Sequence, residues 1–151
     1  MKKIVLVCGM AILVLLTACS NVNEGEVNNS KSSSQLETRI VDGVSLEVKQ
    51  QPTRPIIENN GKQSNTLLTF AVKGTNLTPF PKGLGATDFT WKTEEGKELL
   101  IAENMTAFGD EILSGKSLSE DVYFKVPNNK IDGTLQYKVN NKVISEWKIG
   151  K

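Results

Sequence analysis

The fold is decided by the stretch Asp121-Val122-Tyr123-Phe124-Lys125-Val126-Pro127, which alternates polar and apolar side chains with a period of two. This is the period of a β-strand with one buried and one solvated face, because successive side chains of a strand point to opposite sides. Pro127 ends the strand, since proline has no N–H to donate to a ladder of hydrogen bonds. The pattern places Phe124 in a core and Tyr123 on the polar face.

The same period recurs along the rest of the chain. Alternating runs occupy residues 44–48, 68–72, 89–92, 135–139 and 143–149, and a short apolar run occupies residues 99–102. Turn-forming pairs such as Asp42-Gly43 and Asn140-Asn141 separate the runs. We expect no helix after Leu36 beyond a single turn over residues 110–113. About seven short strands, each with one buried face, predict an all-β, antiparallel β-sandwich.

The aromatic residues divide into core and surface candidates. Trp91 and Trp147 fall on apolar faces, so both are expected in the core. Partner binding is assigned to Tyr123 and to the loop Pro79-Phe80-Pro81, where two prolines hold Phe80 in extended backbone. The alternative for this loop is that Phe80 and Leu84 close one end of the sandwich.

The N-terminus carries an export signal. A short basic start precedes an uncharged apolar run of 13 residues, over residues 4–16. A membrane-spanning helix needs about 20 apolar residues, so this run suits a cleaved signal peptide. The sequence Leu16-Thr17-Ala18-Cys19 resembles the lipobox of bacterial lipoprotein precursors. The resemblance implies that a diacylglyceryl group is attached to Cys19, and that the chain is cleaved between Ala18 and Cys19.

Three parts are expected along the chain. A signal peptide covers residues 1–18, the lipidated Cys19 and a disordered tether cover residues 19–35, and one domain covers residues 36–151. The tether is rich in Asn, Ser, Glu and Gly, and cannot bury enough apolar surface to fold. This organisation predicts a protein anchored by lipid at the extracytoplasmic face of the cell membrane. The other cysteine, Cys8, lies in the signal peptide, so a disulfide in the mature chain is not expected.

Composition argues against several classes of function. Removal of Lys2 and Lys3 with the signal peptide leaves 16 basic and 17 acidic residues, a net charge of −1, which disfavours nucleic-acid binding. The chain has no histidine, which excludes Ser-His and Cys-His catalytic pairs. Neighbouring carboxylates such as Glu120-Asp121 point to opposite sides of a strand and lack the spacing of a calcium loop. We therefore expect no enzymatic activity, no metal and no cofactor.

Three motifs occur in a recognisable order along the chain. They are VKGTNLT at residues 72–78, TDFTW at residues 87–91, and LSGKS at residues 113–117, just before the strand quoted first. In order and spacing they resemble the DUF4352 family of immunoglobulin-like domains, often found on Gram-positive lipoproteins, over residues 38–149. The resemblance implies an immunoglobulin-like sandwich. It carries over no catalytic residue.

The expected function is non-catalytic binding of a protein partner at the cell envelope. Two alternatives stay open at this point. One is a lipoprotein that binds a small ligand or acts as an enzyme. The other is a precursor whose cleaved signal peptide yields a signalling peptide, because residues 11–18 resemble short apolar peptide pheromones.

Overall fold

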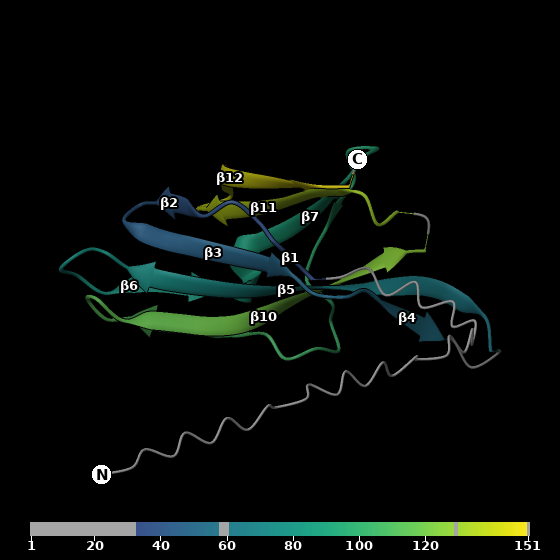
Figure 1. Cartoon of the computed structure of the whole chain (residues 1–151), viewed down its shortest axis with the longest axis horizontal. Coiled ribbons are helices and arrows are strands. Elements are labelled where there is room, and N and C mark those ends of the chain that lie inside the picture. The colour runs from purple at the N-terminus through teal and green to yellow at the C-terminus, as the bar shows by residue number, and fades with distance from the viewer. Residues whose placement is uncertain (1–32, 58–60, 129, 151) are drawn as a thin grey trace, which may run out of the picture.

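The computed structural model describes residues 33–57, 61–128 and 130–150. The predicted signal peptide, Cys19 and the tether up to residue 32 lie outside these residues. Two antiparallel sheets face each other, with a two-stranded ribbon at one end (Figure 1). The six-stranded sheet consists of β1 (Ser34–Gln35), β2 (Arg39–Val41), β3 (Val44–Gln50), β4 (Arg54–Ile57), β5 (Gln63–Asn76) and β10 (Ser117–Pro127). The four-stranded sheet consists of β7 (Phe89–Thr93), β8 (Glu98–Leu99), β11 (Gly133–Val139) and β12 (Lys142–Ile149).

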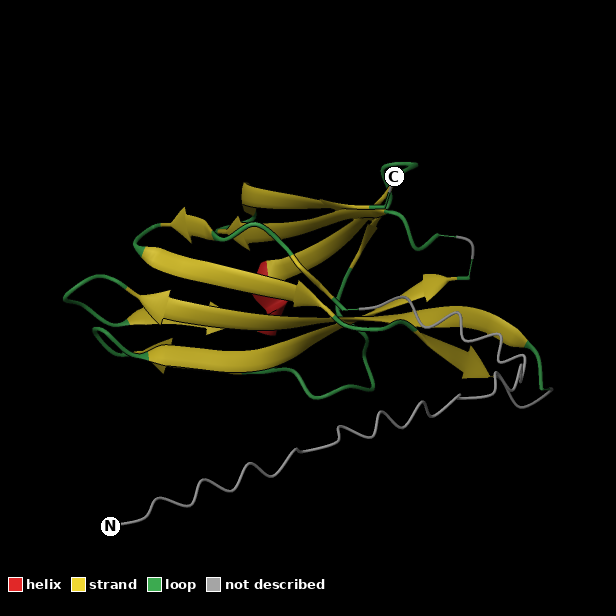
Figure 2. Cartoon of the chain, viewed as in Figure 1, coloured by secondary structure: helices red, strands yellow, loops and turns green. Residues whose placement is uncertain are grey.

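The predicted all-β sandwich is confirmed. The ribbon pairs β6 (Lys82–Gly85) with β9 (Gly109–Ile112), and the one helical segment in the described part is η1 (Ala86–Asp88), red in Figure 2. The alternating runs form β3, β5, β7, β10, β11 and β12. The structure exceeds the expected seven strands because several strands of two to four residues, too short to show a period, pair with the long ones.

The core lies between the two sheets and is built from the predicted apolar faces. Phe124 and Trp91 are fully buried and Trp147 nearly so. The ring centroids of Phe70 and Trp91 lie 5.7 Å apart, which ties the six-stranded sheet to the four-stranded one. The indole N–H of Trp147 donates to the backbone oxygen of Glu37 at 2.6 Å, so its one polar atom is satisfied.

The predicted hairpin turns have the backbone that their residues favour. Asn140 and Asn141 have φ values of 51° and 63°, and Asp42 and Gly43 have values of 48° and 76°. Positive φ at both central residues matches the twist of the strands that they join, which is the reason that Asn, Asp and Gly are found there.

Three expectations need correction. Residues 110–113 do not form a helical turn, because most of them pair with β6 as strand β9. The strand expected over residues 99–102 ends at Leu99, and the chain continues as a loop. Strand pairing begins at Ser34, which pairs with Gln50, two residues before the domain boundary expected at residue 36. No helix in the described part is long and apolar enough to cross a membrane.

Candidate functional site

The loop that contains Phe80 projects from one end of the sandwich. The Phe80 side chain is 73% exposed, whereas Leu84, four residues later, is only 2% exposed and joins the core. The alternative interpretation was thus right for Leu84, which closes this end of the core, and wrong for Phe80. Pro79 and Pro81 flank Phe80 and are exposed as well.

A fully buried asparagine fixes the backbone of this loop. The side-chain amide N–H group of Asn76 donates to the backbone oxygens of Phe80 at 2.7 Å and Ile112 at 2.8 Å. Its side-chain oxygen accepts from the backbone N–H and the hydroxyl of Thr78, both at 2.8 Å. The side chain of Asn76 therefore joins the Phe80 loop to the end of strand β9, and the backbone that carries Phe80 is held in a defined conformation.

Backbone hydrogen bonds join this loop to its two neighbours. The Leu77 N–H donates to the oxygen of Gly43, in the β2–β3 turn, at 2.8 Å. The N–H of Gly115, in the β9–β10 turn, donates to the Asn76 oxygen at 2.9 Å. In Figure 1 these turns gather at the end of the sandwich where β6 lies. Here Leu77 and Leu113 are 57% and 58% exposed, and we name Leu77, Phe80 and Leu113 together the apolar tip.

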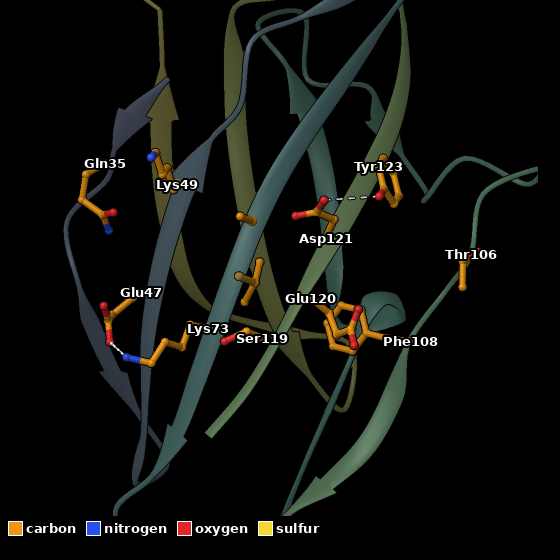
Figure 3. A pocket seen from close by; sticks show the side chains of 12 residues that line it. Gln35, Glu47, Lys49, Lys73, Thr106, Phe108, Ser119, Glu120, Asp121 and Tyr123 are labelled. Atoms are coloured by element: carbon orange, nitrogen blue, oxygen red, sulfur yellow. Dashed lines mark hydrogen bonds and ion pairs between the residues drawn. The ribbon is translucent and has the colours of Figure 1, made fainter. Parts of the chain in front are cut away.

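Tyr123, the second predicted site residue, lies on the outer face of the six-stranded sheet. It follows the buried Val122 on β10 and points away from the core. Its hydroxyl donates to a carboxylate oxygen of Asp121 at 3.3 Å (Figure 3). Burial, and then the charge of Asp121, raise the pKa of Tyr123 above its usual value, so the hydroxyl stays protonated at neutral pH.

A loop over residues 100–108 crosses onto this outer face and makes it concave. The loop is fixed where the Ala102 N–H donates to the Tyr123 backbone oxygen at 2.8 Å. On one side of it lies a hollow of about 430 Å³. Figure 3 shows Glu47 and Lys73 on one side of this hollow and Glu120 and Phe108 on the other, with Asp121 and its hydrogen-bond partner Tyr123 farther along.

Two further hollows lie along the same face. One, of about 190 Å³, is lined by Arg54 and Thr69 and shares Asp121 and Tyr123 with the first. The other, of about 530 Å³, lies beyond the crossing loop and has mainly apolar walls that include Ile56, Leu67 and Leu100. We name the three together the outer-face hollows.

The charges around the outer-face hollows are only partly paired. Lys73 and Glu47 form an ion pair at 2.8 Å. Lys49, Arg54 and Glu120 form no ion pair with any other described residue. Among the described residues there is also no group of three or more side chains placed to hold a metal ion. The site can therefore offer hydrogen bonds, unpaired charges of both signs and apolar contact.

Two titratable groups with shifted pKa values, the partly buried Asp88 and the buried Tyr137, lie near the turn between β6 and β7. Asp88 accepts the Gly85 N–H at 2.7 Å, and burial raises its pKa above the ordinary value despite that bond. Burial, followed by the charges of Asp88 and Asp42, raises the pKa of Tyr137 to about 12. Asp88 closes the turn between β6 and β7, so its role there is to position the ribbon.

The predicted site residues belong to two separate surfaces. Tyr123 pairs with Thr69 in the middle of β5, whereas Phe80 follows Asn76 at the end of that strand. Seven residues of strand separate Thr69 from Asn76, roughly 23 Å. Sequence reasoning missed Leu77 and Leu113, although each is an apolar residue beside a predicted turn. It also missed the crossing loop, whose position depends on a contact between distant parts of the chain.

Comparison with known proteins shows the fold alone. No protein-family model matches the chain, so the DUF4352 resemblance stays an expectation, and no curated protein sequence matches it either. The secreted protein MPT63 of Mycobacterium tuberculosis superposes with a TM-score of 0.52 at 14% identity, covering 77% of this chain and 92% of MPT63. The Bacillus subtilis protein ycdA, provisionally named a lipoprotein, superposes with a TM-score of 0.50 at 16% identity, covering 80% of this chain and 39% of its own length. The chain thus shares its antiparallel β-sandwich with these proteins.

Proposed function

We propose that this protein is an extracytoplasmic lipoprotein, anchored through Cys19, whose β-sandwich binds a protein partner at the cell envelope and catalyses no reaction. The lipobox-like sequence and the signal peptide before it support the anchor. A secreted protein and a provisionally named lipoprotein among the fold neighbours are in keeping with an exported domain. The order and spacing of the three motifs further support kinship with the DUF4352 family.

The observation that carries the binding proposal is the hollowed outer face around Tyr123. The hollows follow β10 from Ser119 to Lys125, a distance of roughly 20 Å. That length accommodates about six residues of an extended polypeptide. An aromatic ring with a polar end is a frequent anchor in protein interfaces, and Tyr123 lies at the centre of this face.

The charges favour a partner segment that carries both signs. Lys49 and Arg54, which form no ion pair within the described part of the chain, offer cations to its carboxylates, and Glu120 offers an acceptor to its basic side chains. Charged groups of this kind fix the register of a partner more than they raise its affinity. We therefore expect recognition of a polar, extended segment of mixed charge.

A small ligand is the competing occupant. The hollow of about 430 Å³ falls within the size range of small-molecule sites. Its walls, however, consist mainly of polar and charged side chains at the surface, whereas most ligand sites are enclosed and largely apolar. The protein partner is therefore the better supported proposal.

Site-specific photocrosslinking tests the proposal. A photoreactive amino acid at Ser119, inside the hollows, should capture one discrete protein in intact cells. The matched control is Lys148, which is exposed on β12 of the other sheet and should capture none. Tyr123→Ala should reduce capture from position 119 without changing the amount of folded protein. Equal capture at both positions, or capture that is indifferent to Tyr123→Ala, would contradict the assigned face.

The anchor has its own test. Cys19→Ser should abolish labelling by a fatty-acid probe and leave an uncleaved precursor or a released protein. Labelling that persists in this variant would end the lipoprotein proposal.

A further inference from the structure

We infer that the apolar tip inserts into the interfacial region of the bilayer to which Cys19 is attached, giving the domain a second contact with the membrane. This inference rests on the proposed lipid anchor. It assigns the two candidate surfaces to different partners. The tip faces lipid, and the outer-face hollows remain open to a protein.

The first argument is the shape and rigidity of the tip. Leu77, Phe80 and Leu113 project from turns, so they form a convex surface, whereas the hollows of the molecule lie on the sheet face. Hydrogen bonds from Asn76 already fix the turns that carry them. Insertion would therefore bury apolar side chains without ordering a loop, which removes one of the main costs of association.

The second argument is charge. Residues 77–81 have no charged side chain, and Lys116 is the only one in residues 113–116. Asp42, in the neighbouring β2–β3 turn, is paired with Lys82 at 2.8 Å. Asp110 and Glu111 lie farther back, on the ribbon strand β9. Apolar side chains with a nearby cation suit the headgroup region of a bilayer, where the chains bury and the ammonium meets lipid phosphate.

The third argument is reach. The described chain begins beside β1, which pairs with the end of β3 that is distant from the tip. The length of β3 is roughly 23 Å. About 14 residues separate Cys19 from Ser33, and an extended chain of that length spans at most roughly 50 Å. The segment is long enough to let the domain lie with its tip against the bilayer that holds Cys19.

The test places a single fluorophore on the lipidated mature chain in pure lipid vesicles. Cys19 is acylated and Cys8 is lost with the signal peptide, so a new cysteine is the only free thiol. Leu113→Cys carries an environment-sensitive dye at the tip. Leu100→Cys is the matched control, because Leu100 is 75% exposed on the loop beyond Tyr123, away from the tip.

We expect the dye at position 113 to shift its emission to shorter wavelength and to be quenched by spin-labelled lipid. The dye at position 100 should show neither effect. Phe80→Asp should reverse the shift at position 113, because a carboxylate resists transfer into the interface. Vesicle flotation, measured in the same samples, reports the Cys19 anchor separately from the tip.

Three outcomes would overturn the inference. One is a dye at position 113 that stays as solvent-exposed as at position 100 while the protein floats with the vesicles. Another is a shift at position 113 that appears only when envelope proteins are added, which would assign the tip to a protein. The third is an equal shift at both positions, which would mean that the membrane contact is unspecific. Loss of flotation would instead refute the anchor and the proposed function with it.

Discussion

Two loops expose an apolar side chain to nearly the same degree but are held very differently. Phe80 is 73% exposed in the loop that follows β5, and Leu100 is 75% exposed in the loop over residues 100–108. The first loop is fixed by the side chain of Asn76, by a bond to the β2–β3 turn and by two bonds to the β9–β10 turn. The second loop has one bond from Ala102 to the sheet, one within the loop from Met105, and one at its end, where the Phe108 oxygen accepts from the Ala86 N–H.

The comparison shows that exposure alone does not identify a docking element. An exposed side chain contributes most to binding when its backbone needs no further ordering. The loop that carries Phe80 meets that condition. The loop over residues 100–108 is better suited to adjust, and it borders two of the hollows proposed for the protein partner. The predictions below test this difference, from the largest expected effect to the smallest.

The largest effect is expected from Asn76→Ala. The substitution removes the side-chain donor to the Ile112 oxygen and the acceptor of the Thr78 N–H, while the Phe80 oxygen keeps the Thr78 hydroxyl as a donor. Each buried unsatisfied group costs about 1–3 kcal/mol. We expect the free energy of unfolding in urea to fall by about 3 kcal/mol or more. Asn104→Ala, in the second loop, is the control and should change it by less than about 0.5 kcal/mol. Similar values for the two variants would remove the distinction between the loops.

Ala102→Pro should have an intermediate effect. It removes the N–H that docks the second loop on Tyr123, a single hydrogen bond whose loss costs about 1 kcal/mol. Limited proteolysis should then cleave within residues 103–107 faster, while urea unfolding shows the modest loss of stability. Unchanged proteolysis would mean that other contacts hold this loop.

Asp88 should make the turn between β6 and β7 sensitive to pH. Its pKa in the folded protein is raised above the ordinary 3.8, so the folded state holds its proton more tightly than the unfolded chain. The contribution of Asp88 to the free energy of unfolding is therefore greatest below pH 3.8, the pKa in the unfolded chain. It declines as the pH rises through the pKa of Asp88 in the folded protein. Asp88→Asn keeps an acceptor for the Gly85 N–H and removes this titration.

The measurement for Asp88 is the thermal midpoint of both proteins between pH 3 and pH 7. The thermal midpoint of Asp88→Asn minus that of the wild type should increase as the pH rises through the acidic range. At higher pH this difference should become constant. A constant difference across the series would show that Asp88 titrates alike in the folded and unfolded chains.

The smallest effect on stability is expected from Phe80→Ala. Its side chain is exposed, so the free energy of unfolding should change by less than about 0.5 kcal/mol. Leu84→Ala, four residues later, should cost about 2–4 kcal/mol because that side chain is buried. If both variants lose stability to a similar extent, Phe80 belongs to the core and not to a docking tip.

The long strands were predictable because burial on one face imposes a period of two. The alternation around Phe124 and Trp147 identified the correct buried faces of β10 and β12. Short strands escaped prediction because two to four residues carry no period. The ribbon strands β6 and β9 also contain glycine, which reads as a turn signal.

The candidate surfaces were predictable only in part. Phe80 and Tyr123 could be selected from sequence because both are aromatic residues where polar ones are usual. Phe80 lies in a proline-rich loop, and Tyr123 lies on the polar face of a strand. The role of Asn76 depends on the distant Ile112, and the hollows depend on a loop that crosses from one sheet to the other. Contacts of this kind are set by tertiary structure, and no local pattern reports them.

The 14-residue strand β5 has a consequence for the order of events in folding. β5 pairs with β4, its immediate predecessor, then with β3, and along its other side with β10, where Asn65 meets Pro127. Loop closure grows more costly with chain separation, so the hairpin of β4 and β5 should nucleate early and the β10 ladder should form last. A sandwich built on such a distant pairing is expected to refold in milliseconds to seconds. Until the β10 ladder forms, one side of β5 is a long unpaired edge that could pair with another chain.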